Sequence, residues 1–420
     1  MRLLETLLPS RLGTQFRWLL GSSWASNLGD GIVLAAGPLL IASQTTDPRL
    51  VALAALLQRL PWLLFGLYAG VLADRLDRIR LSVAVDLLRI LVLVGLLGCI
   101  ATDRIGIGLI LAVVFLLGVA EVFADTTAGT LLPMLVEKRD LGVANARLTA
   151  GFLTVNQLIG PPIGAGLFAL GLLWPFVAQA VVLGCAVLML SRIRVRRSTP
   201  AAVGRSTWTE MVSGLVWTWR SPAVRTLTLT IVTFNVTYGA AWSVLVLYAT
   251  EVLDMGEVGF GLLTSAGAVG GMIGVAGYDW LERRFRLGDI MRVGLILETL
   301  THLALALTRS GGVALVVMVV FGAHAFVWGV TSRTVRMRAV PEELQGRVGS
   351  VYLVGVFGSI VVGNALGGVL ASAWGLLAPF WFAFVGSAVL VVLVWGQMPH
   401  IAHTDDPDGD ADDETVGAAT

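Results

Sequence analysis

The chain has 420 residues, of which 56% are hydrophobic and only 14% are charged. Because a soluble protein carries about 25% charged residues, this composition excludes a single water-soluble core and predicts a protein that crosses a membrane several times. The net charge of +1 decides little, because the arrangement of the charges carries more information than their sum.

Twelve apolar runs are long enough to cross a bilayer, since a hydrocarbon core of about 30 Å needs about 20 helical residues. In chain order they are 17–41, 50–72, 81–101, 106–131, 148–170, 172–191, 223–250, 258–281, 287–308, 312–333, 348–371 and 375–397. The fifth and sixth runs, and the eleventh and twelfth, are joined so closely that we expect helical hairpins. The predicted fold is an all-α membrane protein with twelve transmembrane helices.

Basic residues alternate between the loops, and this alternation predicts the orientation in the membrane. Most of the 29 basic residues lie in the N-terminal segment, in every second loop, in the middle linker and at the adjoining helix ends. The opposite loops hold only Arg49, Arg104 and Arg309. We therefore expect a multi-pass plasma-membrane protein whose two termini both face the cytoplasm.

A linker with a basic start separates six spans from six. The expected divisions are a first six-helix half at 1–191, a cytoplasmic linker at 192–222, a second six-helix half at 223–398 and an acidic, disordered cytoplasmic tail at 399–420. The halves share a weak internal repeat. Its most regular members, 208 residues apart, are Asn27 with Asn235 and Gly31 with Gly239. Parallel six-helix halves on either side of a substrate site form one common transporter architecture.

The loop between the second and third spans concentrates charge in the sequence GVLADRLDRIR, residues 70–80. This loop resembles the G-x-L-a-D-r-x-G-r-k motif of the major facilitator superfamily. Asp77 replaces the second glycine of that motif, and Ile79 replaces its lysine. The matching residues are Gly70, Leu72, Ala73, Asp74, Arg75 and Arg78.

A second motif lies in the fifth span, where residues 160–165 read GPPIGA. It resembles the G-P-x-x-G-G motif of antiporters, with Ala165 in place of the last glycine. The matching residues are Gly160, Pro161, Pro162 and Gly164. Shorter segments at 27–30, 86–89 and 132–136 resemble the branch of bacterial drug and siderophore exporters that includes macrolide-efflux and enterobactin-exporter-like proteins.

Charged side chains inside a span are costly and usually functional. Counted at about 1.5 Å per residue, Asp30 and Arg59 fall at similar depth on consecutive helices, and we expect them to form an ion pair or a hydrogen-bonded pair. Two roles are open: Asp30 takes up a proton during transport, or the pair holds the two spans together. In the second half, Glu298 and His324 lie near mid-depth and are further proton-coupling candidates, or packing residues joined by hydrogen bonds.

A cytoplasmic gate is expected nearer the inner face. Its candidate residues are Asp74, Arg75, Arg78, Asp86, Arg89, Glu121 and Asp125. Asp86 and Arg89 are three residues apart on one helix face, and Asp74 is expected to contact the start of the eleventh span in the closed state. Candidates to line the substrate cavity are Asn27, Asn235, Tyr238 and Trp242.

The resemblance implies a secondary active transporter that works by alternating access. We expect a proton-coupled exporter, an antiporter, of small amphipathic organic compounds such as drugs or siderophores. The alternative is a proton-coupled importer or facilitator of a small nutrient. The sequence has no G-x-x-x-x-G-K-[ST] loop for ATP. It also has no nucleophile–base set, metal cluster or signalling domain that would favour an enzyme or a sensor. The expected partners are a small-molecule substrate, protons and the lipid bilayer, with no nucleic acid, cofactor or metal, and the expected state is a monomer.

Overall fold

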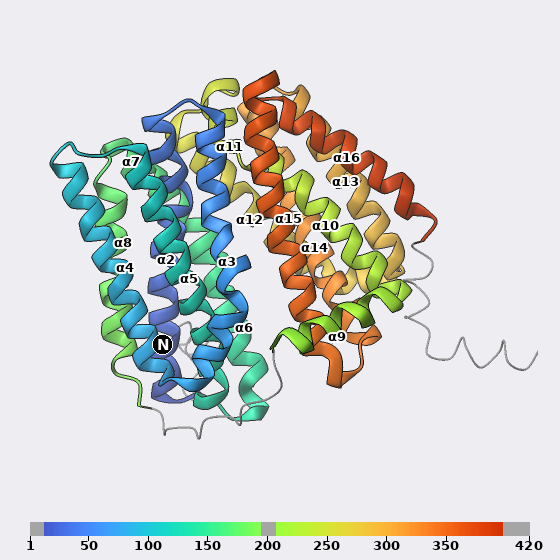
Figure 1. Ribbon diagram of the computed structural model, residues 1–420, viewed down its shortest axis with the longest axis horizontal. Helices are drawn as coiled ribbons and strands as arrows, with labels where there is room; N and C mark the ends of the chain where they lie inside the picture. Colours follow the sequence, from blue (N-terminus) through green and yellow to red (C-terminus); the bar gives the residue numbers. More distant parts are fainter. Residues whose placement is uncertain (1–11, 195–206, 398–420) are drawn as a thin grey trace, which may run out of the picture. The chain divides into compact units, whose positions relative to one another are not determined.

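The computed structural model describes residues 12–194 and 207–397, and the side chains of residues 67, 71, 73–75 and 207–210 are not described within those ranges. All regular secondary structure in the described residues is helical (Figure 1). The predicted acidic tail lies outside them, as does part of the predicted linker.

The helices follow one another with short connections. The first part of the chain forms α2 (Gly13–Gln44), α3 (Pro48–Arg75), α4 (Arg78–Ala101), α5 (Ile107–Leu135), η2 (Lys138–Asp140), α6 (Leu141–Gly151), η3 (Phe152–Ile159), α7 (Gly160–Leu170) and α8 (Trp174–Leu190). The remainder forms α9 (Thr207–Arg220), α10 (Pro222–Trp242), α11 (Leu245–Leu247), η4 (Tyr248–Val252), α12 (Gly256–Arg284), α13 (Leu287–Leu307), α14 (Gly311–Ala339), η5 (Glu342–Leu344), α15 (Gln345–Trp374) and α16 (Ala378–Trp395).

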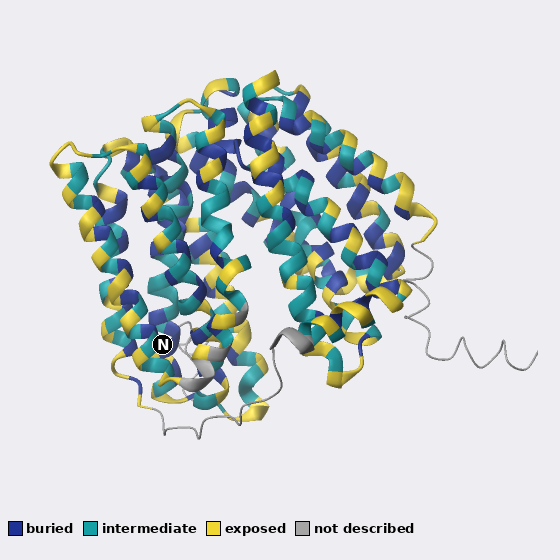
Figure 2. Ribbon diagram, viewed as in Figure 1, coloured by how far each residue is buried: buried dark blue, intermediate teal, exposed yellow. Residues whose placement is uncertain are grey.

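The predicted twelve-span, all-α fold is confirmed. In the described residues, 10 helices are long and apolar enough to cross a membrane, and the bent pair Pro222–Trp242 and Leu245–Val252 supplies one more. The shorter apolar helix α8 supplies the twelfth segment. Large apolar side chains stay exposed along α4 and α16 (Figure 2), as expected for surfaces that face lipid instead of water.

The contacts group the chain into two compact units. Unit 1 comprises Met1–Val203 and Ser243–Ala268, and unit 2 comprises Gly204–Trp242 and Val269–Thr420. The stretch Ser243–Ala268 therefore packs with the first half of the sequence, although the predicted division places it in the second. The division into halves at the linker remains a prediction.

Both predicted hairpins are present, and each turns at a glycine. Gly171 ends α7 with φ 149°, and Gly375 ends α15 with φ 89°. Backbone in this left-handed region favours glycine. The sequence GLLWPF at 171–176 recurs as GLLAPF at 375–380, with proline in the first turn of α8 and α16. This repeat is stronger than the pairs Asn27 with Asn235 and Gly31 with Gly239.

The antiporter-like motif interrupts the helical hydrogen bonding of the fifth span. Pro161 and Pro162 have no N–H, so two carbonyl groups of the preceding turn lose their helical donors. The eight residues of η3 before the motif adopt a π-helix. The hydroxyl group of Ser265 on α12 donates to the freed carbonyl of Leu158 at 2.8 Å. A hydrogen bond from a neighbouring helix satisfies the freed backbone group, and this makes such an irregularity tolerable inside a membrane.

The glycines of this motif let two helices of unit 1 touch backbone to backbone. A Cβ atom on Gly160 would collide with the main chain of Gly31 on α2, and one on Gly164 would collide with the carbonyl group of Ile32. Unit 2 repeats the arrangement, because a Cβ on Gly363 of α15 would collide with the carbonyl of Val236 on α10. Small residues at such contacts are typical of membrane helix packing.

Gly164→Val is expected to destabilise the protein by about 3 kcal/mol, because overpacking against rigid backbone cannot be relieved by rotamer changes. Thermal unfolding in detergent, followed by tryptophan fluorescence, measures the effect. Gly166→Ala is the control, since no atom lies within 4 Å of its added Cβ. Equal stability of the two variants would contradict this account of the contact.

Candidate functional site

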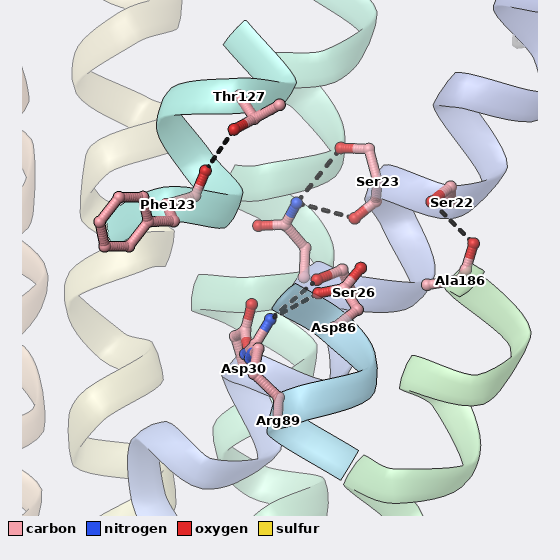
Figure 3. Close-up of polar contacts among 10 residues, drawn as sticks. Ser22, Ser23, Ser26, Asp30, Asp86, Arg89, Phe123, Thr127 and Ala186 are labelled. Carbon is pink, nitrogen blue, oxygen red and sulfur yellow. Dashed lines mark hydrogen bonds and ion pairs between the residues drawn. The ribbon is translucent and has the colours of Figure 1, made fainter. Parts of the chain in front are cut away.

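A buried arginine organises the polar cluster of unit 1. The Arg89 side chain on α4 is 3% exposed and forms ion pairs with Asp30 on α2 and with Asp86 one turn earlier on its own helix (Figure 3). The distance from Arg89 Nη1 to Asp86 Oδ1 is 3.4 Å, and the same nitrogen donates to the Ser26 hydroxyl at 3.4 Å. The predicted pairing of Asp86 with Arg89 is confirmed.

The predicted Asp30–Arg59 ion pair is wrong, because Asp30 pairs with Arg89. The depth count placed Arg89 nearer the cytoplasm than Asp30, and depth alone does not give the rotation of a helix. The electrostatic neighbour of Arg59 on α3 is Glu121 on α5. The separate, more cytoplasmic position assigned to Asp86 and Arg89 is also corrected, since they share one cluster with Asp30.

Two further carboxylic acids belong to this cluster. Glu121 interacts electrostatically with Asp30, Arg59 and Arg89. Asp125, one turn along α5, lies within the electrostatic range of Glu121, Asp30 and Arg89. Together with Asp86, the cluster sets four carboxyl groups against two guanidinium groups, in a segment where uncompensated charge is costly.

The cytoplasmic loop motif is described only in part. The side chains of Asp74 and Arg75 lie outside the described residues, so the expected contact of Asp74 with the eleventh span stays a prediction. Asp77, which departs from the family motif, accepts hydrogen bonds from the backbone N–H groups of Ile79 and Arg80 and caps α4. Arg78 donates to the carbonyl oxygen of Thr130 at 3.1 Å, which ties the loop to α5.

A second titratable cluster lies inside unit 2. The Glu298 carboxylate on α13 is 1% exposed, with His302 Nε2 at 2.8 Å from one oxygen and His324 Nε2 at 2.9 Å from the other. These distances suit ion pairs. The Nδ1 atoms of both histidines are buried without a hydrogen-bond partner among the described residues. No group of described His, Cys, Asp or Glu side chains has a metal-site arrangement.

Aromatic rings cover this cluster. The ring of Trp242 stands edge-on to His302, with centroids 5.8 Å apart, and Phe321 stands edge-on to His324 at 5.4 Å. Tyr238 contacts Trp242 at 4.5 Å. Tyr238 and Trp242 are half-buried, so both rings keep some exposed surface.

The two polar cavity candidates, Asn27 and Asn235, differ in burial. Asn235 is buried, because α15 packs closely on α10. Asn27 is half-buried, and its amide donates to the carbonyl of Ser23 on its own helix at 2.8 Å. The cavity roles of Asn27, Asn235, Tyr238 and Trp242 remain predictions.

A cation–π contact in unit 2 was not predicted from the sequence. The guanidinium carbon of Arg336, near the end of α14, lies 3.5 Å from the ring centre of Tyr352 on α15. The Tyr352 hydroxyl lies 3.3 Å from that of Ser332. No sequence signal could find this pair, because the residues lie on separate helices and follow no motif.

Comparison with known proteins yields one family over almost the whole chain. The family described as transmembrane secretion effector matches residues 6–415. The multidrug efflux pump Tap of Mycolicibacterium fortuitum is 30% identical over 383 residues, which cover 86% of this chain and 90% of that protein. Tap of Mycobacterium tuberculosis is 26% identical over 410 residues, with coverage of 93% and 95%.

Solved structures agree on the fold. A bacterial homologue of the iron transporter ferroportin, in an inward-facing state, aligns with a TM-score of 0.73 at 18% identity and covers 91% of this chain and 98% of its own. A mutant of the nucleoside transporter NupG aligns with a TM-score of 0.75 at 10% identity, with coverage of 91% and 100%. At these identities the likeness concerns the fold alone.

Proposed function

Because the chain belongs to the transmembrane secretion effector family of the major facilitator superfamily, we propose that it exports drugs and other small amphipathic molecules by alternating access, in exchange for protons. Export is supported by the multidrug efflux pumps of the Tap type, which match the chain over most of its length. We propose further that the protein is a monomer in the plasma membrane with both termini in the cytoplasm, an orientation that the distribution of arginines predicts.

The observation that carries proton coupling is the Glu298 cluster. A carboxylate in contact with two imidazole groups can take up or release a proton while all three groups stay buried. Histidine changes its charge near neutral pH. Among the described residues, the cluster has no counter-charge besides its own members within ion-pair distance. Its net charge therefore follows its protonation state, which is the property that an antiport cycle requires.

The Asp30–Arg89 cluster of unit 1 supports the same proposal from the other half of the sequence. Its two guanidinium groups leave two of the four carboxyl groups without a neutralising partner, and protonation is the least costly way to balance charge inside a bilayer. A proton held there would weaken the hold of Arg89 on Asp30. We assign Asp86, Arg89, Glu121 and Asp125 to conformational gating through this cluster.

The aromatic rings near Glu298 are suited to bind apolar or cationic substrates. Tyr238, Trp242 and Phe321 form one cluster, with ring centroids 4.5–6.0 Å apart. Such rings offer large apolar area and can stack on aromatic drugs or hold a cation. Because Trp242 also contacts His302, a bound substrate and the proton site would act on the same side chains.

Trp242→Ala is expected to weaken binding of an aromatic cationic dye about tenfold, since loss of one aromatic contact of this size removes a large part of the binding energy. Equilibrium dye binding to the purified protein, followed by fluorescence anisotropy, measures it. Trp374→Ala is the matched control, because Trp374 is exposed at the end of α15. Unchanged dye affinity in the Trp242 variant would remove the aromatic cluster from the binding site.

The direction of transport is tested in inside-out membrane vesicles that contain the protein. With an acidic vesicle lumen, an exporter accumulates the dye inside the vesicles, and collapse of the pH gradient releases it. Accumulation in right-side-out vesicles instead would favour the importer alternative. Accumulation that needs no ion gradient would rule out antiport.

A further inference from the structure

Helix α9, which precedes the seventh span, has an exposed apolar stripe. Val212, Leu215, Val216 and Trp219 recur at intervals of three and four residues, and all four are exposed. The opposite face packs on α15, where the backbone of Gly214 lies against that of Arg347. An amphipathic helix with one free apolar face next to a transmembrane span is typical of a helix that lies in the membrane interface.

A groove lies beneath this helix, entirely within unit 2. It has a volume of about 300 Å³ and is formed by α9, α10 and α15. Its lining is almost wholly apolar. The apolar lining includes Leu215, Leu229, Val232, Val351 and Val354. This volume is at the lower end of small-ligand sites and fits a narrow, flexible hydrocarbon better than a broad rigid drug.

Polar atoms in the groove have unmet bonding capacity. Thr218 on α9 is 3% exposed, and its hydroxyl has no hydrogen-bond partner in the described part of the chain. The hydroxyl of Thr228 on α10 is also buried without a hydrogen-bond partner among the described residues. Buried polar groups are usually paired, so these two hydroxyls give the groove hydrogen-bonding capacity toward a bound molecule.

The cation of the groove is Arg225, in the first turn of α10. Among the described residues its hydrogen bond goes to the carbonyl oxygen of Trp219, at a long distance of 3.4 Å. Most of its guanidinium donors are therefore available. Arginine binds phosphate with paired, charge-assisted hydrogen bonds.

We propose that this groove binds one anionic phospholipid, with an acyl chain between α9, α10 and α15 and the phosphate on Arg225. The apolar stripe of α9 holds the groove at the depth of the headgroups, where an acyl chain and a phosphate occur together. The inner leaflet is rich in anionic lipid, which a cationic groove attracts. This site is separate from the proposed transport site and does not depend on the identity of the drug.

The test is native mass spectrometry of the delipidated full chain titrated with phosphatidylglycerol or with phosphatidylcholine. We expect one discrete phosphatidylglycerol adduct, preferred about tenfold over phosphatidylcholine. Arg225→Gln should weaken this adduct about tenfold, since it removes a charge-assisted bond. Arg220→Gln is the matched control, because Arg220 is exposed nearby and does not line the groove.

Leu229→Trp fills the groove without changing its charge and should remove the adduct, while thermal unfolding in detergent confirms that the variant is folded. Equal adducts in the parent chain and in the Arg225 and Leu229 variants would overturn the proposal. So would equal binding of the two lipids. Loss of dye binding in Leu229→Trp with the lipid adduct intact would also overturn it, because the groove would then take substrate.

Discussion

Glu298→Gln is expected to abolish proton-driven accumulation of substrate while leaving substrate binding within about threefold of the parent. Glutamine keeps the size of the side chain but cannot gain or lose a proton. Both histidines would keep a polar neighbour, so the fold should persist. Without a titratable carboxyl group between His302 and His324, occupancy by protons and occupancy by substrate are no longer linked.

Transport of a dye into inside-out vesicles, with and without a pH gradient, separates the two effects. The variant should equilibrate the dye down its own gradient but not concentrate it. Glu257→Gln is the control, because Glu257 is an exposed acid in the first turn of α12. A Glu298 variant that still concentrates the dye as well as the control would exclude this residue from coupling.

Arg89→Gln is expected to destabilise the protein by about 3–5 kcal/mol, the usual effect of breaking a buried ion pair by removing one partner. The substitution leaves Asp30 and Asp86 in the membrane interior without the guanidinium group that they share. Adding Asp30→Asn to this variant should recover much of the loss, because one of the two unpaired charges is then gone.

Thermal unfolding of the purified variants measures both effects. Arg80→Gln is a matched control on the same helix, since Arg80 forms an ion pair with Asp77 whose partners are 79% and 41% exposed. Exposed pairs contribute only about 0–1 kcal/mol. If Arg80→Gln and Arg89→Gln were equally stable, or if Asp30→Asn gave no recovery, the buried cluster would not have the role assigned to it.

The fold could be predicted from the sequence because the bilayer imposes a simple rule. A span needs about 20 predominantly apolar residues, so runs of apolar residues give the number of helices almost directly. Tight connections predicted the two hairpins. The close helix contacts at Gly164 and Gly363 follow the same logic, because glycine is expected where two backbones meet.

The partners of the buried charges could not be predicted in the same way. The rise per residue gives the depth of a side chain but not the rotation of its helix, and rotation decides whether Asp30 faces Arg59 or Arg89. The burial of Asn235 could not be predicted either. A polar residue in a span can satisfy itself within packed protein, so polarity alone does not show that a position borders a cavity.

The contacts of His302 are in part predictable from the sequence and in part dependent on helix packing. Its position one turn after Glu298 predicts that the two share a helix face. The presence of His324 on the other oxygen of the same carboxylate depends on how α13 packs against α14. The contact of both histidines with aromatic rings from α10 and α14 also required the structure.

Proton exchange itself is measured most directly by the reverse experiment. The protein is reconstituted into liposomes that contain a pH-sensitive dye, and a substrate gradient is imposed without any pH gradient. Because coupling is reciprocal, antiport predicts that protons move against the direction of substrate flow, and that Glu298→Gln eliminates the pH change. Substrate movement with no change of internal pH in the parent protein would contradict proton-coupled export.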